Sequence, residues 1–168
     1  MIRGSLVPNI TIFDHHGNLD IERTRWHMWW MFSKGVDGLF LTGSYGAGPM
    51  MTNAERIRVF EIAREVASEF EGKVLIPHVG CIDTKSTLEL AKAAERIGVD
   101  GIAAVPPFYY KHSEDLILRF YKDIVDSVSI PVYAYNNPET SRFTFTINTV
   151  YKLQEMGLAG LKDSPVEV

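Results

Sequence analysis

"GVDGLF", residues 35–40, is repeated almost unchanged as "GVDGIA" at residues 98–103, and a looser copy, "GLAGLK", occupies residues 157–162. In each copy a glycine follows a segment with helical spacing, and a second glycine opens a short apolar run. Glycine readily adopts the left-handed conformation that closes a helix, and short apolar runs are typical of buried strands. The repeat therefore predicts one recurring joint, at which a helix gives way to a strand.

Working outward from these joints, the sequence predicts strict alternation of short apolar strands and single helices. We expect strands at residues 6–12, 38–41, 74–79, 101–105, 132–135 and 160–162, and helices at residues 21–33, 53–69, 84–97, 114–127 and 147–156. Four of the helices are preceded by residues that favour the N-cap position, namely Thr52, Asp83, Ser113 and Thr146. Continuously apolar strands joined by helices indicate a parallel sheet that is covered on its faces.

Both a doubly wound sheet and a closed barrel have this element order. We predict an α/β fold of the TIM (β/α)₈ barrel type, with residues 1–168 supplying about the first six β/α units. A closed barrel needs eight units and typically ~250 residues. We therefore expect a single barrel domain over residues 1–168 that lacks its C-terminal part, and we favour a fragment over completion by association.

Composition excludes several classes of protein. The chain has 168 residues, 46% of them hydrophobic, and a formal net charge of −4 with both signs interspersed, which does not suit a nucleic-acid-binding surface. A single cysteine, Cys81, excludes an intramolecular disulfide. The stretch "MIRGSLVPNI" lacks the long apolar run of a signal peptide or membrane helix. We expect a cytoplasmic protein with neither nucleic acid nor membrane as its partner.

The first predicted helix carries tryptophans at positions 26, 29 and 30, which share one helical face. Such a stripe could be an aromatic ligand platform. We favour packing instead, and expect it to face the sheet or a subunit contact.

Residues that bear chemistry follow four of the predicted strands. They are "TGSYGAGP" at residues 42–49, "PPFYYKH" at 106–112, "YAYNNPETSR" at 133–142 and the lysine at position 162. In parallel β/α folds, ligands bind at the carboxyl ends of the strands. We therefore expect these segments to converge on one binding site.

Lys162 ends an apolar run, and the helix signals Ser164 and Pro165 follow it at once. An ordinary lysine amine has a pKa near ~10.4, so it is rarely neutral at pH 7, whereas burial disfavours the ammonium form. A desolvated amine at this position can attack a ketone and form a Schiff base without a metal. Tyr135, which ends the neighbouring predicted strand, is the candidate to move protons for it.

The loop after the second predicted strand is rich in small residues. Its segment "GSYGAG" offers backbone N–H groups and the Ser44 hydroxyl, and it leads into a helix. Such a loop can hold a carboxylate without a cationic side chain. Together with the lysine, it favours a keto acid as ligand.

These segments together resemble the N-acetylneuraminate lyase and dihydrodipicolinate synthase superfamily of class I pyruvate-dependent aldolases. The resemblance rests on Gly43-Ser44-Tyr45-Gly46 for the family's G-[ST]-[ST]-G loop, on residues 135–138 (YNNP) for Y-N-x-P, and on residues 160–163 (GLKD) for G-[LVI]-K-[DE]. The opening "VPNITIFDHHGNLD" is similar to the family's first strand and turn. The resemblance spans the whole chain.

The resemblance implies a role for each matching residue. Lys162 would form the Schiff base, Tyr135 would be the acid and base, Ser44 would belong to a proton relay, and Tyr109 would reach into a neighbouring subunit's site. Gly43, Ser44, Tyr45 and Gly46 would bind the pyruvate carboxylate. The resemblance further implies a homodimer or homotetramer, pyruvate and an aldehyde as reaction partners, and no metal or other cofactor.

Departures from the family's motifs bear on the substrate. Tyr45 replaces a usual threonine, and Ala47 replaces the glutamate that lyases and synthases usually carry. Gly48-Pro49 matches a variant seen in 2-keto-3-deoxy-gluconate aldolases. We therefore predict an aldolase or lyase that cleaves or forms a carbon–carbon bond in a 2-keto-3-deoxy sugar acid.

Three alternatives stay open. A dihydrodipicolinate synthase, which condenses pyruvate with aspartate semialdehyde, usually has an arginine where this chain has Thr140. A paralogue could bind a keto acid without turnover. A metal-dependent enzyme would use His15, His16 and His78, but the first two lie in a sequence typical of a turn, and we expect adjacent side chains to point apart.

Overall fold

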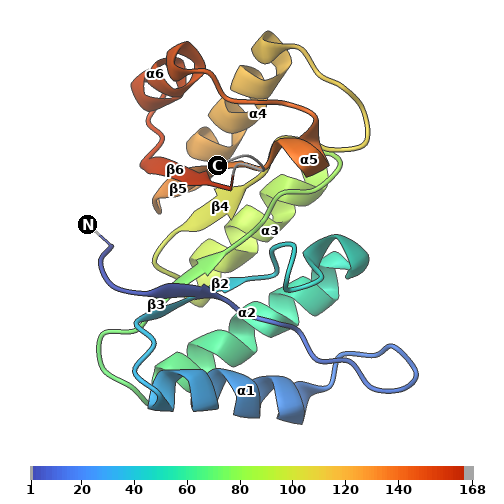
Figure 1. The fold of residues 1–168 in the computed structure, drawn as a ribbon, viewed down its shortest axis with the longest axis vertical. Coiled ribbons are helices and arrows are strands. Elements are labelled where there is room, and N and C mark those ends of the chain that lie inside the picture. Colours follow the sequence, from blue (N-terminus) through green and yellow to red (C-terminus); the bar gives the residue numbers. More distant parts are fainter. Residues whose placement is uncertain (1, 165–168) are drawn as a thin grey trace. The chain divides into compact units, whose positions relative to one another are not determined.

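The computed structural model describes residues 2–164, in which parallel strands alternate with helices (Figure 1). The strands are β1 (Leu6–Pro8), β2 (Gly38–Leu41), β3 (Val74–Pro77), β4 (Ile102–Ala104), β5 (Val132–Asn136) and β6 (Gly160–Asp163). The helices are α1 (Ile21–Ser33), the 3-10 turn η1 (Gly48–Met50), α2 (Asn53–Ala67), α3 (Thr84–Ile97), α4 (Glu114–Ser127), α5 (Pro138–Ser141) and α6 (Ile147–Glu155). Two short turns, η1 and α5, were not expected from the sequence.

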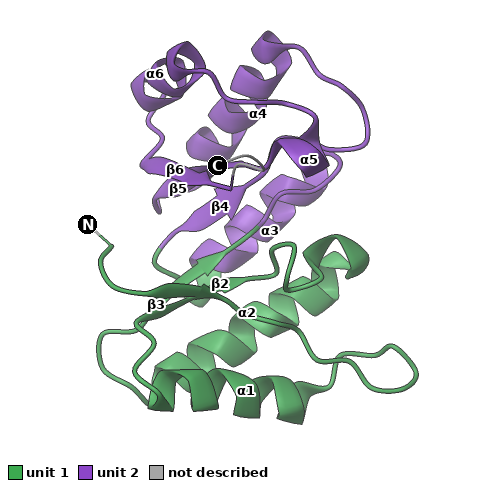
Figure 2. Cartoon of the chain, viewed as in Figure 1, with its two compact units in different colours: residues 1–78, 96–100 green, residues 79–95, 101–168 purple. Residues whose placement is uncertain are grey.

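Two compact units make up the chain, coloured separately in Figure 2. Unit 1 comprises residues 1–78 and 96–100, and it contains a three-stranded parallel sheet in the order β1-β2-β3. Helix α1 packs against α2, and α2 contacts β3. The unit's core is apolar, with fully buried side chains that include Met28, Phe60, Leu39 and Leu75.

Unit 2 comprises residues 79–95 and 101–168, with a second three-stranded parallel sheet in the order β4-β5-β6. Helix α4 packs on both β5 and α6. Tyr121 of α4 is fully buried, and its hydroxyl donates a hydrogen bond of 2.7 Å to the Ala104 carbonyl. This polar contact inside an apolar core fixes α4 on β4.

All strand pairs in both sheets are parallel. The α/β class and the parallel strand direction predicted from the sequence are confirmed.

Burial differs among the strands in a way that the sequence did not predict. All residues of β2 and β4 are buried, as expected for continuously apolar strands. β1 is largely exposed, and in β6 half-buried residues alternate with exposed ones such as Leu161. Each of these two strands lies at the edge of its sheet and pairs with a single described neighbour. The expectation that every strand is buried is wrong for β1 and β6. Among the described residues, each of them has a neighbouring strand on one side only.

The tryptophans of α1 do not face the sheet. Trp26, Trp29 and Trp30 are 62%, 43% and 43% exposed, whereas the buried side of the helix carries Met28 and Phe32. Packing on the sheet, one of the two expected arrangements, is therefore wrong, and a subunit contact stays a prediction. Helical spacing correctly grouped them on one face, but it could not distinguish a core-facing stripe from an exposed one.

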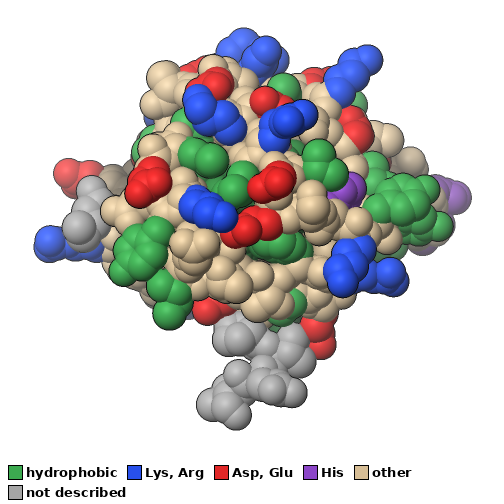
Figure 3. Space-filling model, turned by 90° about the horizontal axis from the view of Figure 1, so that it is seen from above, with side chains coloured by type: hydrophobic (Ala, Val, Ile, Leu, Met, Phe, Trp, Pro, Cys, Tyr) green, Lys and Arg blue, Asp and Glu red, His purple; other side chains and the backbone are tan. Residues whose placement is uncertain are grey.

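Charges of both signs are interspersed on the face shown in Figure 3. Ion pairs among the described residues include Lys152 with Glu114, 3.2 Å apart between α6 and α4. None of the helices in residues 2–164 combines the length and apolarity that a membrane crossing requires.

We expect Thr52→Ala to lower the free energy of unfolding by about 1 kcal/mol. Thr52 is the N-cap of α2 in a reciprocal capping box, in which its hydroxyl accepts from Glu55 N and Glu55 accepts from Thr52 N. Ser113→Ala is the matched control because Ser113 occupies the N-cap of α4 without a side-chain capping bond. Urea denaturation of both variants measures the difference, and equal losses would contradict the capping argument.

Candidate active site

Lys162 and Tyr135 lie side by side on paired strands. β5 and β6 are parallel, and their register makes Tyr135 and Lys162 direct Cα partners. Paired residues on adjacent strands point to the same face of a sheet. The Lys162 amine accordingly lies over the Tyr135 ring, with Nζ 3.7 Å from the ring centroid. The structure thus brings together the two residues to which the sequence assigned the central chemistry.

The surroundings of this pair are partly shielded from solvent. Tyr135 is buried, with 6% of its surface exposed, and Lys162 is half-buried. A lysine amine over an aromatic face is attracted by the negative charge of the π-system. The chain therefore holds the amine at a fixed place, although the amine is less enclosed than the sequence led us to expect.

Ser164 is a third member of this cluster, and the sequence analysis did not assign it a role. The Lys162 Nζ donates a hydrogen bond of 2.8 Å to Ser164 Oγ. The Ser164 backbone N–H donates to the Asn136 carbonyl at 3.0 Å, which continues the pairing of the two strands. Alternation along a strand could have identified it because residues i and i+2 share a face. Pro165, the other expected helix signal, lies outside the described residues.

The pKa of the Tyr135 phenol reflects these neighbours. Burial alone would raise the pKa, but hydrogen bonds involving Ser164 and Lys162, the positive charge of Lys162 and a hydrogen bond from Asn137 outweigh burial. The net effect holds the pKa of Tyr135 below its ordinary value near 10. A phenol of this kind gives up its proton more readily than an isolated tyrosine.

Asn136 clamps the ends of the two strands together. Its amide Nδ2 donates to Asp163 Oδ1 at 2.7 Å, and its Oδ1 accepts from the Phe145 backbone N–H at 3.4 Å. The side chain is buried, with 7% of its surface exposed. Because Asp163 and Ser164 follow Lys162 directly, this clamp fixes the backbone that carries the lysine.

Asn137 and Pro138 complete the Y-N-x-P motif. Asn137 Nδ2 donates to the Tyr135 hydroxyl at 3.4 Å, and Pro138 begins the short helix α5. Proline suits the first position of a helix because its backbone lacks an N–H that would be unsatisfied there. The chain therefore turns away at once, which leaves Asn137 beside the phenol.

Tyr109 lies on the loop between β4 and α4. Its side chain is 69% exposed and packs edge-to-face on Tyr110, with ring centroids 4.9 Å apart. Its backbone has a φ of 85°, in a region that a bulky residue rarely adopts. The predicted role of Tyr109 in a neighbouring subunit's site stays a prediction.

The glycine loop lies in unit 1 and follows β2 directly. Backbone hydrogen bonds from Ala47 N to Ser44 O and from Gly48 N to Gly43 O, both 3.2 Å, close it on itself. A Cβ on Gly48 would lie 1.8 Å from the Thr42 carbonyl oxygen, so only glycine fits. Successive amides in such a turn form a cavity that suits an anion.

Ser44 and Tyr45 of this loop are exposed, whereas Gly46 is buried. Within the described chain, no acceptor is assigned to the backbone N–H groups of Ser44, Tyr45 and Gly46. The Tyr45 side chain points outward and is 78% exposed. All four residues that the sequence selected for carboxylate binding, Gly43 to Gly46, therefore share one loop, with the tyrosine side chain outside it.

Buried hydrogen bonds hold the glycine loop at residues 43–46 in place. Thr42 is fully buried with a φ of 49°, and its hydroxyl donates to the His78 carbonyl at 2.9 Å. Arg56 of α2 is 2% exposed and donates to the same carbonyl. The Thr11 hydroxyl donates a hydrogen bond of 2.7 Å to the Gly46 carbonyl. The loop is thereby held by fixed partners in the same unit.

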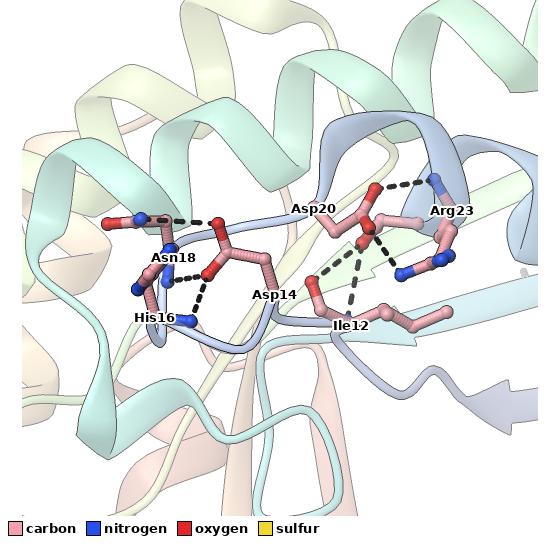
Figure 4. A network of polar contacts seen from close by, with 7 residues as sticks. Ile12, Asp14, His16, Asn18, Asp20 and Arg23 are labelled. Atoms are coloured by element: carbon pink, nitrogen blue, oxygen red, sulfur yellow. Dashed lines mark hydrogen bonds and ion pairs between the residues drawn. The ribbon is translucent and has the colours of Figure 1, made fainter.

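The histidines considered as metal ligands occupy different surroundings. Asp14 accepts hydrogen bonds from the backbones of His16 and Asn18, so this segment is a turn (Figure 4). The rings of His15 and His16 lie 3.8 Å apart, which corrects the expectation that they point apart on an extended chain. His78 is buried beside the Arg56 guanidinium, whose charge disfavours a cation. Residues 2–164 contain no group of three or more potential ligands suited to a metal ion.

Comparison with known proteins adds to this geometry. A model of the Dihydrodipicolinate synthetase family matches residues 1–167. The chain belongs to this family. The N-acetylneuraminate lyase of Citrobacter koseri is 38% identical over 166 residues, which are 97% of this chain and 55% of that protein.

Solved structures also resemble this fold. CdNal from Clostridium difficile, in complex with mannosamine, has a TM-score of 0.91 at 30% identity and covers 99% of this chain and 58% of its own. YagE from E. coli K12, described as a dihydrodipicolinic acid synthase family protein in complex with pyruvate, has a TM-score of 0.92 at 29% identity, covering 99% and 56%. The chain thus spans little more than half the length of the relatives it matches.

We expect an ultraviolet pH titration to detect an unusually acidic tyrosine that is missing from Tyr135→Phe. Replacing Lys162 by Met should raise the pKa of Tyr135 because the positive charge and one hydrogen bond disappear while burial remains. The stabilisation linked to this phenol is complete only above pH ~10 and is lost as the pH falls through the lowered pKa. An unchanged tyrosine titration in Lys162→Met would contradict this assignment.

Proposed function

We propose that this protein is a class I pyruvate-dependent aldolase in which Lys162 forms a Schiff base with the keto acid. The observation that carries the proposal is the Lys162–Tyr135 pair, whose reactive groups are held together by strand register. An amine attacks a ketone and releases water through a carbinolamine, and both steps require a proton donor and acceptor close by. The Tyr135 phenol, whose pKa is lowered, suits that task.

The remaining site residues have supporting roles in this proposal. The loop at residues 43–46 binds the pyruvate carboxylate through its amides, and the Ser44 hydroxyl belongs to the proton relay. Tyr109 acts in the site of a neighbouring subunit within a homodimer or homotetramer. Residues 1–168 form about six units of one TIM-barrel domain. No cofactor is needed because Lys162 itself forms the imine with the keto acid. The imine withdraws electrons once it is protonated.

The proposed substrate is a 2-keto-3-deoxy sugar acid, which the enzyme splits into pyruvate and an aldehyde or forms from them. Relatives named N-acetylneuraminate lyase support this class because N-acetylneuraminate is itself such an acid. The finer likeness to 2-keto-3-deoxy-gluconate aldolases rests on Ala47, Gly48 and Pro49 alone. The cytoplasm is the proposed compartment.

Incubation with pyruvate followed by borohydride should add one reduced pyruvyl group to Lys162, detectable by peptide mass spectrometry. Lys162→Met should abolish the adduct. Lys152→Met is the matched control because Lys152 makes only a partly exposed ion pair with Glu114, and it should label normally. An unlabelled Lys162 in the unsubstituted protein would overturn the proposal.

Assays with candidate aldehydes and acids separate the proposed function from its alternatives. Turnover of 2-keto-3-deoxy sugar acids supports the proposed substrate class, whereas condensation with aspartate semialdehyde alone would favour a synthase. A pyruvate adduct without turnover of any aldehyde would indicate a paralogue that binds keto acids. Loss of activity in a chelator would revive the metal-dependent alternative.

A further inference from the structure

Thr11 joins the segment after β1 to the glycine loop after β2. Its hydroxyl donates a hydrogen bond of 2.7 Å to the Gly46 carbonyl, 35 residues further along the chain. A carbonyl oxygen can only accept, so the hydroxyl proton points toward Gly46. Both residues belong to unit 1, where Thr11 is half-buried and Gly46 is buried. The contact therefore has a fixed direction, from the threonine to the loop.

The backbone at Gly46 is closely packed. A Cβ at this position would lie 2.8 Å from Thr42 N and 2.9 Å from the Asn9 carbonyl oxygen. These distances are too short for a side-chain carbon, so the loop can approach the ends of β1 and β2 only with glycine here. Asn9 N in turn donates to the Phe40 carbonyl at 2.9 Å, which continues the pairing of β1 with β2. The Gly46 carbonyl is thus held in place as the acceptor for Thr11.

A chain of hydrogen bonds leads from Thr11 to an amide of the loop. The Gly46 carbonyl and the Ala47 N–H belong to one peptide unit, and Ala47 N donates to the Ser44 carbonyl at 3.2 Å. The Ser44 carbonyl shares its own peptide unit with the Tyr45 N–H, for which the described chain assigns no acceptor. Hydrogen bonds in series polarise one another, by roughly 10–30% per bond. The hydroxyl at Gly46 therefore makes the Tyr45 N–H a stronger donor.

A second chain of the same kind ends at the neighbouring amide. Met50 N donates to the Ala47 carbonyl at 3.0 Å. Gly48 N belongs to that peptide unit and donates to the Gly43 carbonyl at 3.2 Å. The Gly43 carbonyl in turn shares its peptide unit with the Ser44 N–H. Two successive amides are thereby polarised, and such a pair suits an anion. Backbone groups form this second chain, whereas a threonine hydroxyl opens the first.

We propose that Thr11 is a positioning residue that polarises the glycine loop for the carboxylate of the keto acid. This inference rests on the proposed function. The hydroxyl acts through the peptide units of the loop and does not itself touch the substrate. Its effect depends on the charge of the ligand, because a hydrogen bond to an ionised acceptor is about twice as strong as one to a neutral acceptor. A purely structural tether would instead affect charged and uncharged ketones alike.

The test is the rate of borohydride-trapped adduct on Lys162, measured as a function of ketone concentration. Pyruvate and methyl pyruvate are the two probes, because the ester keeps the ketone but carries no negative charge. Thr11→Val keeps nearly the same shape without the hydroxyl. It should raise the pyruvate concentration for half-maximal rate about fivefold, the size of one ordinary hydrogen bond. The maximal rate should stay unchanged because only binding is weakened. With methyl pyruvate, both values should stay close to those of the unsubstituted protein.

Two further variants complete the experiment. Thr11→Ser keeps the hydroxyl and should restore the pyruvate dependence of the unsubstituted protein. Ser33→Ala is the matched control, because Ser33 Oγ also donates to a backbone carbonyl at 2.7 Å in unit 1, that of Trp30 in helix α1. It should leave the labelling by both ketones unchanged. Thermal unfolding checks that each variant is folded, and Thr11→Ala carries the same expectation if Thr11→Val does not fold.

The failure of this inference and the failure of the proposed function are distinguishable. Absence of any adduct in the unsubstituted protein would overturn both proposals. Normal labelling of the unsubstituted protein, with an unchanged pyruvate dependence in Thr11→Val, would overturn the role of Thr11 alone. Equal losses for pyruvate and methyl pyruvate would also overturn it, since they would indicate a structural tether. A Thr11→Ser variant that behaves like Thr11→Val would count against it too, because the donor is still present.

Discussion

The register between β5 and β6 is the constraint on which the candidate site depends. A shift of one residue in a strand sends every side chain to the opposite face. Here the pairing of Tyr135 with Lys162 places phenol and amine on one face, and the clamp from Asn136 to Asp163 secures that pairing at the strand ends. The chemistry of the site thus follows from backbone alignment more than from any single contact.

This alignment also explains how Tyr135 can be buried beside a charged lysine. Tyr135 is buried beside a lysine, which is a costly arrangement for two isolated ionisable groups. The lysine charge and the hydrogen bonds of Ser164 and Asn137 offset the burial of the phenol. In unit 1 a comparable arrangement holds the glycine loop, where Thr42 and Arg56 converge on the His78 carbonyl. Both units therefore stabilise polar segments at the ends of strands with buried hydrogen bonds.

Much of this arrangement was predictable from the sequence, and the exceptions have physical reasons. The range of α1 and the caps at Thr52 and Thr146 follow from local patterns, which depend only on neighbouring residues. Exposure of the edge strands and of Trp26 depends on what covers them, which periodicity does not encode. The left-handed Tyr109 gave no signal because its residue type disfavours that conformation. Ser164 was named only as a helix signal because the matched motif, residues 160–163, ends one residue before it.

β6 and β1 each lie at the edge of a described sheet. A strand edge with unpaired backbone groups invites intermolecular β-pairing, and charged side chains on such an edge oppose it. β6 carries Lys162 and Asp163 on successive positions, and β1 ends on Pro8, which has no N–H to contribute to a ladder. Within the described sheets, Lys162, Asp163 and Pro8 therefore disfavour further pairing along the edges of β6 and β1.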